Sequence, residues 1–218
     1  MLEALWNTYS FFTTYARLDR FQPKMTFLPV GERPSLDRWI IAELNRLLDE
    51  VDGELSAYNV TSAARRIEEF VDVLSNWYVR RSRRRFWKSE QDWDKAAAYL
   101  TLYECLVTLA KLMAPLAPFI AEEVYRNLVA SWDGSAPESV HLTDFPQADR
   151  ALVDEELIAD TRLVMRLASL GRSARNRAGI KLRQPLRAAR VLVREEGERP
   201  GVERLAAQLL DELNVKEP

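Results

Sequence analysis

The sequence has 218 residues, 47% of them apolar, which is enough for the core of one large domain or of one domain with an appendage. Its 31 basic and 33 acidic residues give a formal net charge of −2, which argues against a protein that coats nucleic acid over its whole surface; such a partner would have to meet a local patch. The single cysteine, Cys105, excludes an internal disulfide bond and fits a reducing compartment, so we expect a cytoplasmic location.

The sequence predicts neither membrane insertion nor export. No apolar run approaches the length of a membrane span. Residues 1–12 lack the basic region and the cleavage site of a signal peptide. We therefore expect no membrane partner. Met1 stands directly before helix-like sequence, so a complete chain and an excised piece of a longer protein both remain open.

Long helices should dominate the first three-quarters of the chain, because seven glycines is few for this length. The clearest helix starts at Ser35, with Ser35 as its N-cap and apolar residues at steps of three and four as far as Leu55. A second helix should run from about residue 59 to residue 87, with Ile67 and Tyr78 in its apolar stripe.

A third helix is predicted after Asp92. It should end near Met113, because Pro115 and Pro118 remove helical donors and clash with the preceding turn. The apolar stripe then restarts on a short fourth helix that includes Phe119.

The helical pattern ends near Gly179, where the character of the sequence changes. Before it, a loop of residues 131–146 leads to a fifth helix of roughly residues 152–178. After it, the pattern predicts a strand, a turn, a short helix and the start of another strand, at residues 188–193, 195–201, 202–210 and 213–216. The expected fold is mainly α: a helical bundle over residues 1–180, then a small, truncated α/β unit over residues 181–218. A strand whose partner is missing favours the excised piece.

The chain shows no self-contained active site. His141 is the only histidine and Cys105 the only cysteine, so a zinc site built from those ligands is nearly excluded. No glycine-framed phosphate loop and no nucleophile-elbow pattern occurs. His141 lies in an expected loop and is better explained as a structural residue. We predict no catalytic residue and no metal ligand.

The arginine segment, residues 76–88, reads NWYVRRSRRRFWK and holds six basic and four aromatic side chains. On a helical wheel the apolar stripe continues from Tyr78 into Arg81 and Arg85, so the core face turns cationic. An unpaired buried charge is costly, so these arginines must leave the bundle, pair with acids or meet an anionic partner. The other faces carry Arg80, Arg83, Arg84, Trp77 and Trp87, which suit phosphate contacts and stacking. A salt-bridge network with acids elsewhere in the chain is the alternative.

The basic segment, residues 161–194, contains ten arginines and lysines and no acid, so the rest of the chain sums to −12. One flank of its helix carries Arg162, Arg166, Ser169, Ser173 and Arg177, on the side away from Val164, Leu167 and Ala174. Such a row of cations and hydroxyls can follow a phosphodiester backbone. A salt-bridged surface is the alternative. No helix-turn-helix, zinc-finger or RNP pattern occurs, so the flank favours shape-driven recognition of structured RNA.

Seven motifs cover essentially the whole chain: LWNTYSFFTTYA (5–16), LDRWI (36–40), LSNWYVRRSRRRFW (74–87), KLMAPLAPFIAEEVY (111–125), ESVHLTDFP (138–146), IKLRQPL (180–186) and ELNVKE (212–217). In these motifs and in their order, the chain resembles the helical anticodon-binding domain that follows the catalytic domain of isoleucyl-tRNA synthetases. The arginine run looks like the isoleucyl branch. Valyl, leucyl and methionyl synthetases share the bundle but not that run, and they remain an alternative.

The resemblance implies a class I synthetase that activates isoleucine with ATP and transfers it to tRNA, with magnesium. Both ATP-handling signatures of the family, of the His-Ile-Gly-His and Lys-Met-Ser-Lys-Ser types, are missing here, and so is the editing domain. We therefore expect this chain to bind tRNA without catalysing the reaction and without a cofactor of its own. Its expected partners are tRNA and the catalytic and editing domains of the same polypeptide, and the piece itself is expected to be monomeric. A helical interaction scaffold with internal arginine ion pairs is the alternative from another class.

The resemblance also assigns roles to the basic residues. The arginine segment would lie where the helical domain meets the catalytic domain and the tRNA, with Arg81 and Arg85 paired with acids. The flank of the basic segment would take the anticodon stem-loop. The candidate RNA-binding residues are Arg80, Arg84, Trp87, Lys88, Arg162, Arg166, Arg172, Arg175, Arg177, Lys181 and Arg183.

Overall fold

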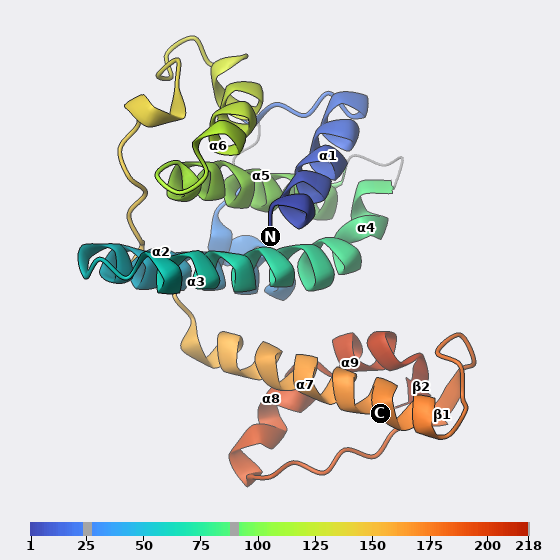
Figure 1. The fold of residues 1–218 in the computed structure, drawn as a ribbon. Helices are drawn as coiled ribbons and strands as arrows, with labels where there is room; N and C mark the ends of the chain where they lie inside the picture. The colour runs from blue at the N-terminus through green and yellow to red at the C-terminus, as the bar shows by residue number, and fades with distance from the viewer. Residues whose placement is uncertain (24–27, 88–91, 218) are drawn as a thin grey trace. The chain divides into compact units, whose positions relative to one another are not determined.

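The computed structural model describes residues 1–23, 28–87 and 92–217. They form two compact units, Met1–Val153 (unit 1) and Asp154–Pro218 (unit 2). Unit 1 is helical, and unit 2 combines helices with a two-stranded parallel sheet (Figure 1). The prediction of a mainly α fold is confirmed.

Unit 1 consists of six α-helices joined by shorter helical turns. The α-helices are α1 (Leu2–Leu18), α2 (Ser35–Ser56), α3 (Val60–Val73), α4 (Arg80–Trp87), α5 (Trp93–Met113) and α6 (Pro118–Tyr125). Two π-helical turns, η3 (Leu74–Val79) and η4 (Arg126–Ala130), and three 3-10 turns, η2 (Val30–Glu32), η5 (Val140–Leu142) and η6 (Arg150–Leu152), complete its helical elements in the described residues.

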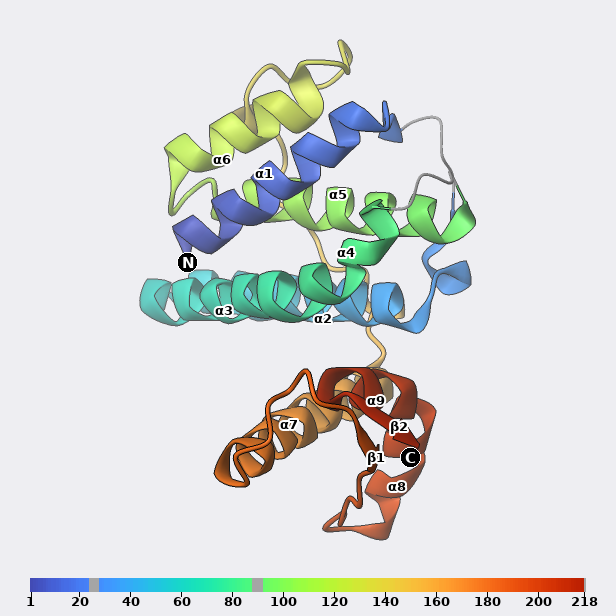
Figure 2. The same cartoon turned by 90° about the vertical axis from the view of Figure 1, so that its right-hand side faces the viewer.

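Helix α5 runs through the middle of unit 1, with α2 and α3 on one side and α1 and α6 on the other (Figures 1 and 2). Among the described residues it is the one helix that is long and apolar enough, by length and composition, to cross a membrane. This contradicts the prediction that no apolar run approaches that length. Of its most apolar window, 67% is buried inside the protein. A helix that packs against neighbours over most of its surface is apolar over most of its surface, which accounts for the composition.

The helix boundaries follow the sequence closely. Helix α2 begins at Ser35, but its N-cap is Pro34 and no side chain caps it, so the N-cap role predicted for Ser35 is wrong. Helix α5 begins after Asp92, whose side chain accepts a hydrogen bond from the backbone N of Lys95 at 2.8 Å. The expectation that Phe119 belongs to the core is also wrong, because Phe119 is 91% exposed and the other face of α6 packs inward.

The predicted second helix is continuous from Val60 to Trp87, but the π-helical turn η3 interrupts its α-helical pitch. The turn holds an extra residue, so every later side chain is rotated relative to a straight wheel. After Tyr78 the buried positions are Val79, Ser82 and Phe86, whereas Arg81 and Arg85 are only partly buried. The prediction that the core face turns cationic therefore holds only in part: the Arg85 side chain is 11% exposed and pairs with the buried Asp37.

Five tyrosines of unit 1 have raised pKa values, and the rise is largest at Tyr78, Tyr99 and Tyr103. Burial is the main cause for each of them. The charge of Asp37 adds to the effect at Tyr78, and a hydrogen bond to Asp19 adds to it at Tyr99. The pKa of Tyr103 is raised to about 12. All three hydroxyls therefore favour the neutral form in the folded chain.

We expect the free energy of unfolding of unit 1 to fall as the pH rises above 10.0, the ordinary pKa of tyrosine. A group whose pKa is raised by folding stabilises fully below its unfolded pKa, and that contribution is lost as the pH rises through its folded pKa. For Tyr103 the window runs from 10.0 to about 12. Chemical unfolding at a series of alkaline pH values measures the decline, and Tyr103→Phe should lessen it. A constant free energy of unfolding across the window would contradict the expectation.

Unit 2 is built on one long helix. Its elements are α7 (Glu155–Arg177), β1 (Leu186–Ala188), η7 (Glu196–Glu198), α8 (Arg199–Arg204), α9 (Ala206–Leu213) and β2 (Val215–Glu217). The two strands are parallel, with Leu186 opposite Val215. Helix α7 packs on α8 and α9. A Cβ atom on Gly171 would lie 2.5 Å from Cδ2 of Leu213, so the glycine permits the close approach of α9.

The tail partly matches its predicted elements. The fifth helix is present, whereas the first strand lies at Leu186–Ala188 and not at residues 188–193. The units divide between Val153 and Asp154, and not after residue 180. The reason is that α7 buries its apolar side against α8 and α9, so it belongs with the C-terminal elements.

Candidate nucleic-acid interface

Arg85 is tied inside unit 1 by carboxylates. Its Nη2 lies 2.6 Å from Oδ2 of Asp37, and its Nε lies 2.9 Å from Oδ1 of Asp94. Tyr78 donates a hydrogen bond to Oδ1 of the same Asp37 at 2.6 Å, and the Asp37 side chain is fully buried. Burial alone would lower the pKa of Arg85, but its hydrogen bonds to Asp37 and the nearby charges raise that pKa. The geometry agrees with the ion-pair role predicted for Arg85.

Arg80 and Arg81 both lie over the ring of Trp77. Their guanidinium carbons are 5.9 Å and 5.4 Å from the ring centroid. Nε of the exposed Arg80 donates to the backbone oxygen of Asn76 at 2.9 Å. Trp77 is itself buried, so it supports these arginines from below and does not offer its face to a partner.

The outer side of α4 presents cations and an aromatic ring. Arg83 and Arg84 are exposed, and Trp87 is 57% exposed. No ion pair joins Arg83 or Arg84 to a carboxylate within residues 1–23, 28–87 and 92–217. Lys88, the remaining candidate in this segment, lies outside the described residues. Arg84 and Trp87 therefore retain the exposure that RNA contact requires.

The flank predicted for the basic segment lies along one exposed side of α7. All five of its members are exposed: Arg162, Arg166, Ser169, Ser173 and Arg177. The buried side of the same helix carries Ile158, Val164 and Ala168. Ala174 was predicted to lie on that side but is exposed, and Arg175 is buried in its place. We call the five exposed residues the α7 flank.

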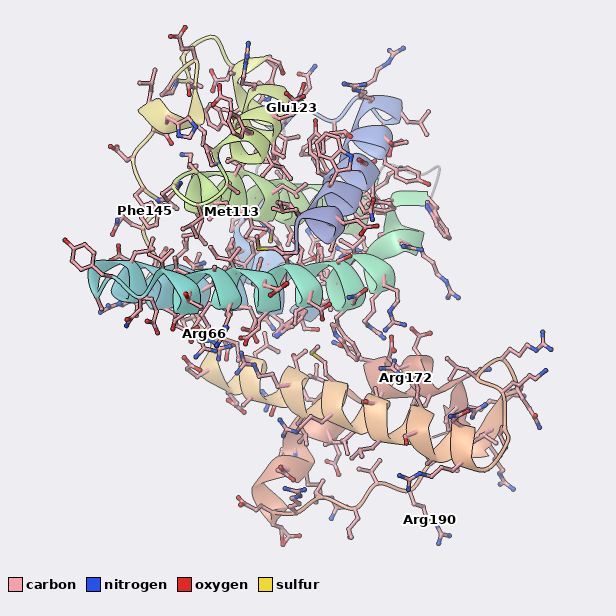
Figure 3. All side chains as sticks on the ribbon, viewed as in Figure 1. Arg66, Met113, Glu123, Phe145, Arg172 and Arg190 are labelled. Atoms are coloured by element: carbon pink, nitrogen blue, oxygen red, sulfur yellow. The ribbon has the colours of Figure 1, made fainter. Side chains whose placement is uncertain are left out.

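Arg172 forms an ion pair within unit 2. Its Nη1 lies 2.7 Å from Oε2 of Glu212 on α9, and the Glu212 side chain is 3% exposed. Figure 3 labels Arg172 on α7. The pair joins the two helices, which speaks against Arg172 as a free phosphate ligand.

The structure contradicts the RNA contact predicted for Arg175, because this residue is only 6% exposed. Its Nη2 donates to the backbone oxygen of Lys181 at 2.7 Å and also to the backbone oxygen of Gln184. A side chain that fills the inside of a turn cannot reach a phosphate. The sequence concealed this because arginine is rarely buried away from a carboxylate.

The turn after α7 continues the row of cations. Lys181 and Arg183 are both exposed, and Arg190, farther along, projects away from the ribbon in Figure 3. In the described part of the chain no ion pair joins Lys181 or Arg183 to a carboxylate. These two candidates keep the geometry that phosphate contact needs.

Two residues that shape the site were missed at the sequence level. Asp37 lies in the first turn of α2, and only the fold shows that it is the buried partner of Arg85. Asn214 has φ 48 and donates to the backbone oxygen of Leu182 at 3.0 Å. Asparagine adopts the left-handed backbone conformation more readily than most residues do. The Leu-Asn-Val sequence could therefore have indicated a tight turn there.

The described residues do not bring three side chains of His, Cys, Asp or Glu together in a way that could hold a metal ion. They do not fit the magnesium ion that the resemblance implies for a longer protein. Cys105 is buried in the core, where burial raises the pKa of its thiol. The chemistry of the surface is therefore that of guanidinium and ammonium groups.

The chain matches the family described as "Anticodon-binding domain of tRNA ligase" over residues 37–191. It is 62% identical over 212 residues to an isoleucine--tRNA ligase of Dehalococcoides mccartyi, covering 97% of this chain and 21% of that protein. It is 50% identical over 215 residues to the isoleucine--tRNA ligase of Thermus thermophilus, covering 98% of this chain and 20% of that protein. A relative of the same name from Bacteroides fragilis is 45% identical over 214 residues. The chain thus spans about a fifth of the length of the curated relatives it matches.

Proposed function

The chain belongs to the family of anticodon-binding domains of tRNA ligases, and from that premise we propose that it binds the anticodon stem-loop of an isoleucine tRNA as one part of an isoleucine--tRNA ligase. The observation that carries the proposal is the exposed α7 flank, in a segment of residues 161–194 that contains no acid. Arginines spaced along one side of a helix can contact successive phosphates. The names of the relatives support isoleucine over valine, leucine or methionine.

The whole ligase would join isoleucine to its tRNA with ATP and magnesium, and that chemistry would come from catalytic and editing domains outside this chain. The exposed side of α4, with Arg84 and Trp87, would face those domains or the tRNA. Lys88 belongs to the same proposal, as do Arg80 and Arg81 near Trp77. We further propose that the chain is monomeric, works in the cytoplasm and uses α5 as a core helix with no membrane partner.

The scaffold alternative finds support at some arginines only. Arg85 and Arg172 pair with carboxylates of their own units, as a scaffold with internal ion pairs requires. Arg166 and Arg177 are exposed, and the described residues provide no carboxylate partner for either. The α7 flank therefore favours an external anion. The scaffold hypothesis accounts for the paired arginines, and the RNA-binding hypothesis accounts for the exposed ones.

Binding of the 218-residue chain to a synthetic anticodon stem-loop of isoleucine tRNA, titrated against salt, tests the proposal. Each phosphate neutralised on a single strand contributes a slope of about −0.7 in log K against log salt, so three to five contacts predict roughly −2 to −3.5. A stem-loop with a different anticodon but the same stem should keep that slope and bind more weakly if bases are read. An affinity that barely responds to salt would contradict phosphate-led binding.

A further inference from the structure

The turn after α7 is closed by its own backbone and filled by an arginine. Helix α7 ends at Arg177, and Gly179, two residues later, has a φ of 68, a conformation that glycine adopts at little cost. The backbone N of Gln184 then donates to the backbone oxygen of Lys181 at 2.9 Å, which closes a turn of residues 181–184. The carbonyl oxygens of Lys181 and Gln184 both accept from Nη2 of Arg175. We call residues 181–184 the contact turn.

Asn214 holds the contact turn from the other side. Its Nδ2 donates to the backbone oxygen of Leu182 at 3.0 Å, and its own backbone oxygen accepts from the N of Leu186 at 3.0 Å. Asn214 leads directly into β2, which pairs with β1 in parallel. The turn is therefore fixed between the end of α7 and the two-stranded sheet.

The charge on Arg175 is offset by carbonyl groups. No carboxylate forms an ion pair with it among the residues that the structure describes. Its place in the last turn of α7 is also favourable, because the C-terminal carbonyls of a helix attract a cation. All of its hydrogen bonds to the contact turn come from Nη2, while Nε and Nη1 of Arg175 are buried without a hydrogen-bond partner in the described residues. Lysine would not serve equally well, because its ammonium ends on a shorter side chain and is a compact, strongly hydrated charge that is costly to bury.

In the contact turn, backbone carbonyl oxygens face the interior of unit 2 and the cationic side chains face the solvent. The carbonyl oxygens of Lys181, Leu182 and Gln184, which would repel an anion, accept hydrogen bonds from Arg175 or Asn214. The side chains of Lys181 and Arg183 remain exposed. Arg177, the last residue of α7, is exposed as well, so the turn extends the α7 flank beyond the helix. A turn that is already ordered loses little conformational freedom when it binds.

We infer that Arg175 is a positioning residue that fixes the contact turn as a binding surface for RNA phosphate, with Lys181 and Arg183 as the side chains that touch it. The inference rests on the proposed function for its ligand. It assigns Arg175 a part in binding without any contact to RNA. Replacing Arg175 should therefore lower the affinity for RNA only by displacing Lys181 and Arg183.

Hydrogen exchange in the 218-residue chain tests the hold on the turn. Arg175→Met should raise exchange at the amides of Gln184 and Leu186 about tenfold or more, because both depend on an ordered turn, and should leave the first half of α7 unchanged. Arg172→Met is the matched control, since Arg172 lies on the same helix and pairs with Glu212 instead. Arg175→Lys keeps the charge and should still loosen the turn, which covers the case in which the methionine variant does not fold. Unchanged exchange in Arg175→Lys, or an equal rise in Arg172→Met, would overturn the positioning role.

Binding to the same anticodon stem-loop tests the ligand. Lys181→Ala with Arg183→Ala should weaken binding about tenfold and reduce the salt slope by about 1 to 2. Adding Arg175→Lys to that pair should cost no more than about twofold further, because the cations that it positions are already gone. A full multiplication of the separate losses would overturn the inference while leaving the proposed function intact. If the unaltered chain binds no stem-loop, the proposed function fails together with the assigned ligand, and the exchange result still decides the role of Arg175.

Discussion

Alanine in place of Asp37 should lower the free energy of unfolding of unit 1 by about 3–5 kcal/mol. Asp37 is fully buried and accepts hydrogen bonds from both Arg85 and Tyr78. Its loss leaves a guanidinium that is 11% exposed, and in the described residues the carboxylate still paired with it is that of Asp94. Breaking one partner of a buried pair is costly mainly because the other charge stays behind. Denaturant unfolding followed by tryptophan fluorescence measures the loss.

Asp49→Ala is the matched control for that measurement. Asp49 also pairs with an arginine, Arg150, at 2.7 Å, but the two side chains are 52% and 81% exposed. Water screens such a pair, so its removal should lower the free energy of unfolding far less than the loss of Asp37 does. Asp37→Asn should fall between the two, since it keeps the shape and one acceptor. Equal losses for Asp37→Ala and Asp49→Ala would refute the claim that burial makes the Asp37 pair important.

Alanine at Arg162, Arg166 and Arg177 together should weaken binding of the anticodon stem-loop about a hundredfold at roughly 0.1 M salt. Three phosphate contacts would be lost, and the salt slope should fall by roughly 2 to 3. The three side chains are exposed on the α7 flank, so the melting of unit 2 should change little. Fluorescence anisotropy of labelled RNA across a salt series measures both quantities.

A second triple variant separates position from net charge. Arg66, Arg126 and Arg150 are exposed arginines of unit 1, and each pairs with a carboxylate of that unit. Their replacement by alanine removes the same charge from the chain but should lower affinity only a few-fold, through the long-range field. If both triple variants weaken binding equally, the loss comes from the change in net charge, and the α7 flank is not the binding site. If the first triple changes stability but not binding, the scaffold reading is correct for these residues.

Periodicity was sufficient to predict the helices but not the roles of individual arginines. The α7 flank follows from steps of three and four along one helix, and its five members are exposed as expected. Arg175 and Arg177 lie two residues apart with the same chemistry, yet one is buried and the other is not. The difference depends on carbonyl oxygens of residues 181 and 184, which reach Arg175 only after the chain has turned back. No pattern within the helix carries that information.

The arginine segment shows a second limit of wheel arguments. A straight wheel places Arg81 and Arg85 in line with Tyr78, whereas the π-helical turn η3 brings Ser82 and Phe86 inward. A π-helical turn is fixed by tertiary packing more than by local composition, so it could not be anticipated. The ion pairing of Arg85 was nevertheless foreseen, because a charge so close to the core must be compensated. Its partner Asp37, 48 residues earlier, became evident only from the fold.

The division between Val153 and Asp154 also separates two kinds of recognition chemistry. Every phenylalanine, tyrosine and tryptophan of the chain precedes residue 154. Unit 2 therefore has no aromatic side chain on which an unpaired nucleobase could stack, and only the planar guanidinium groups of its arginines could take that role. If the chain binds RNA as proposed, stacking of aromatic rings on bases would fall to unit 1, and unit 2 would contact the phosphate backbone by charge and the edges of bases through polar groups.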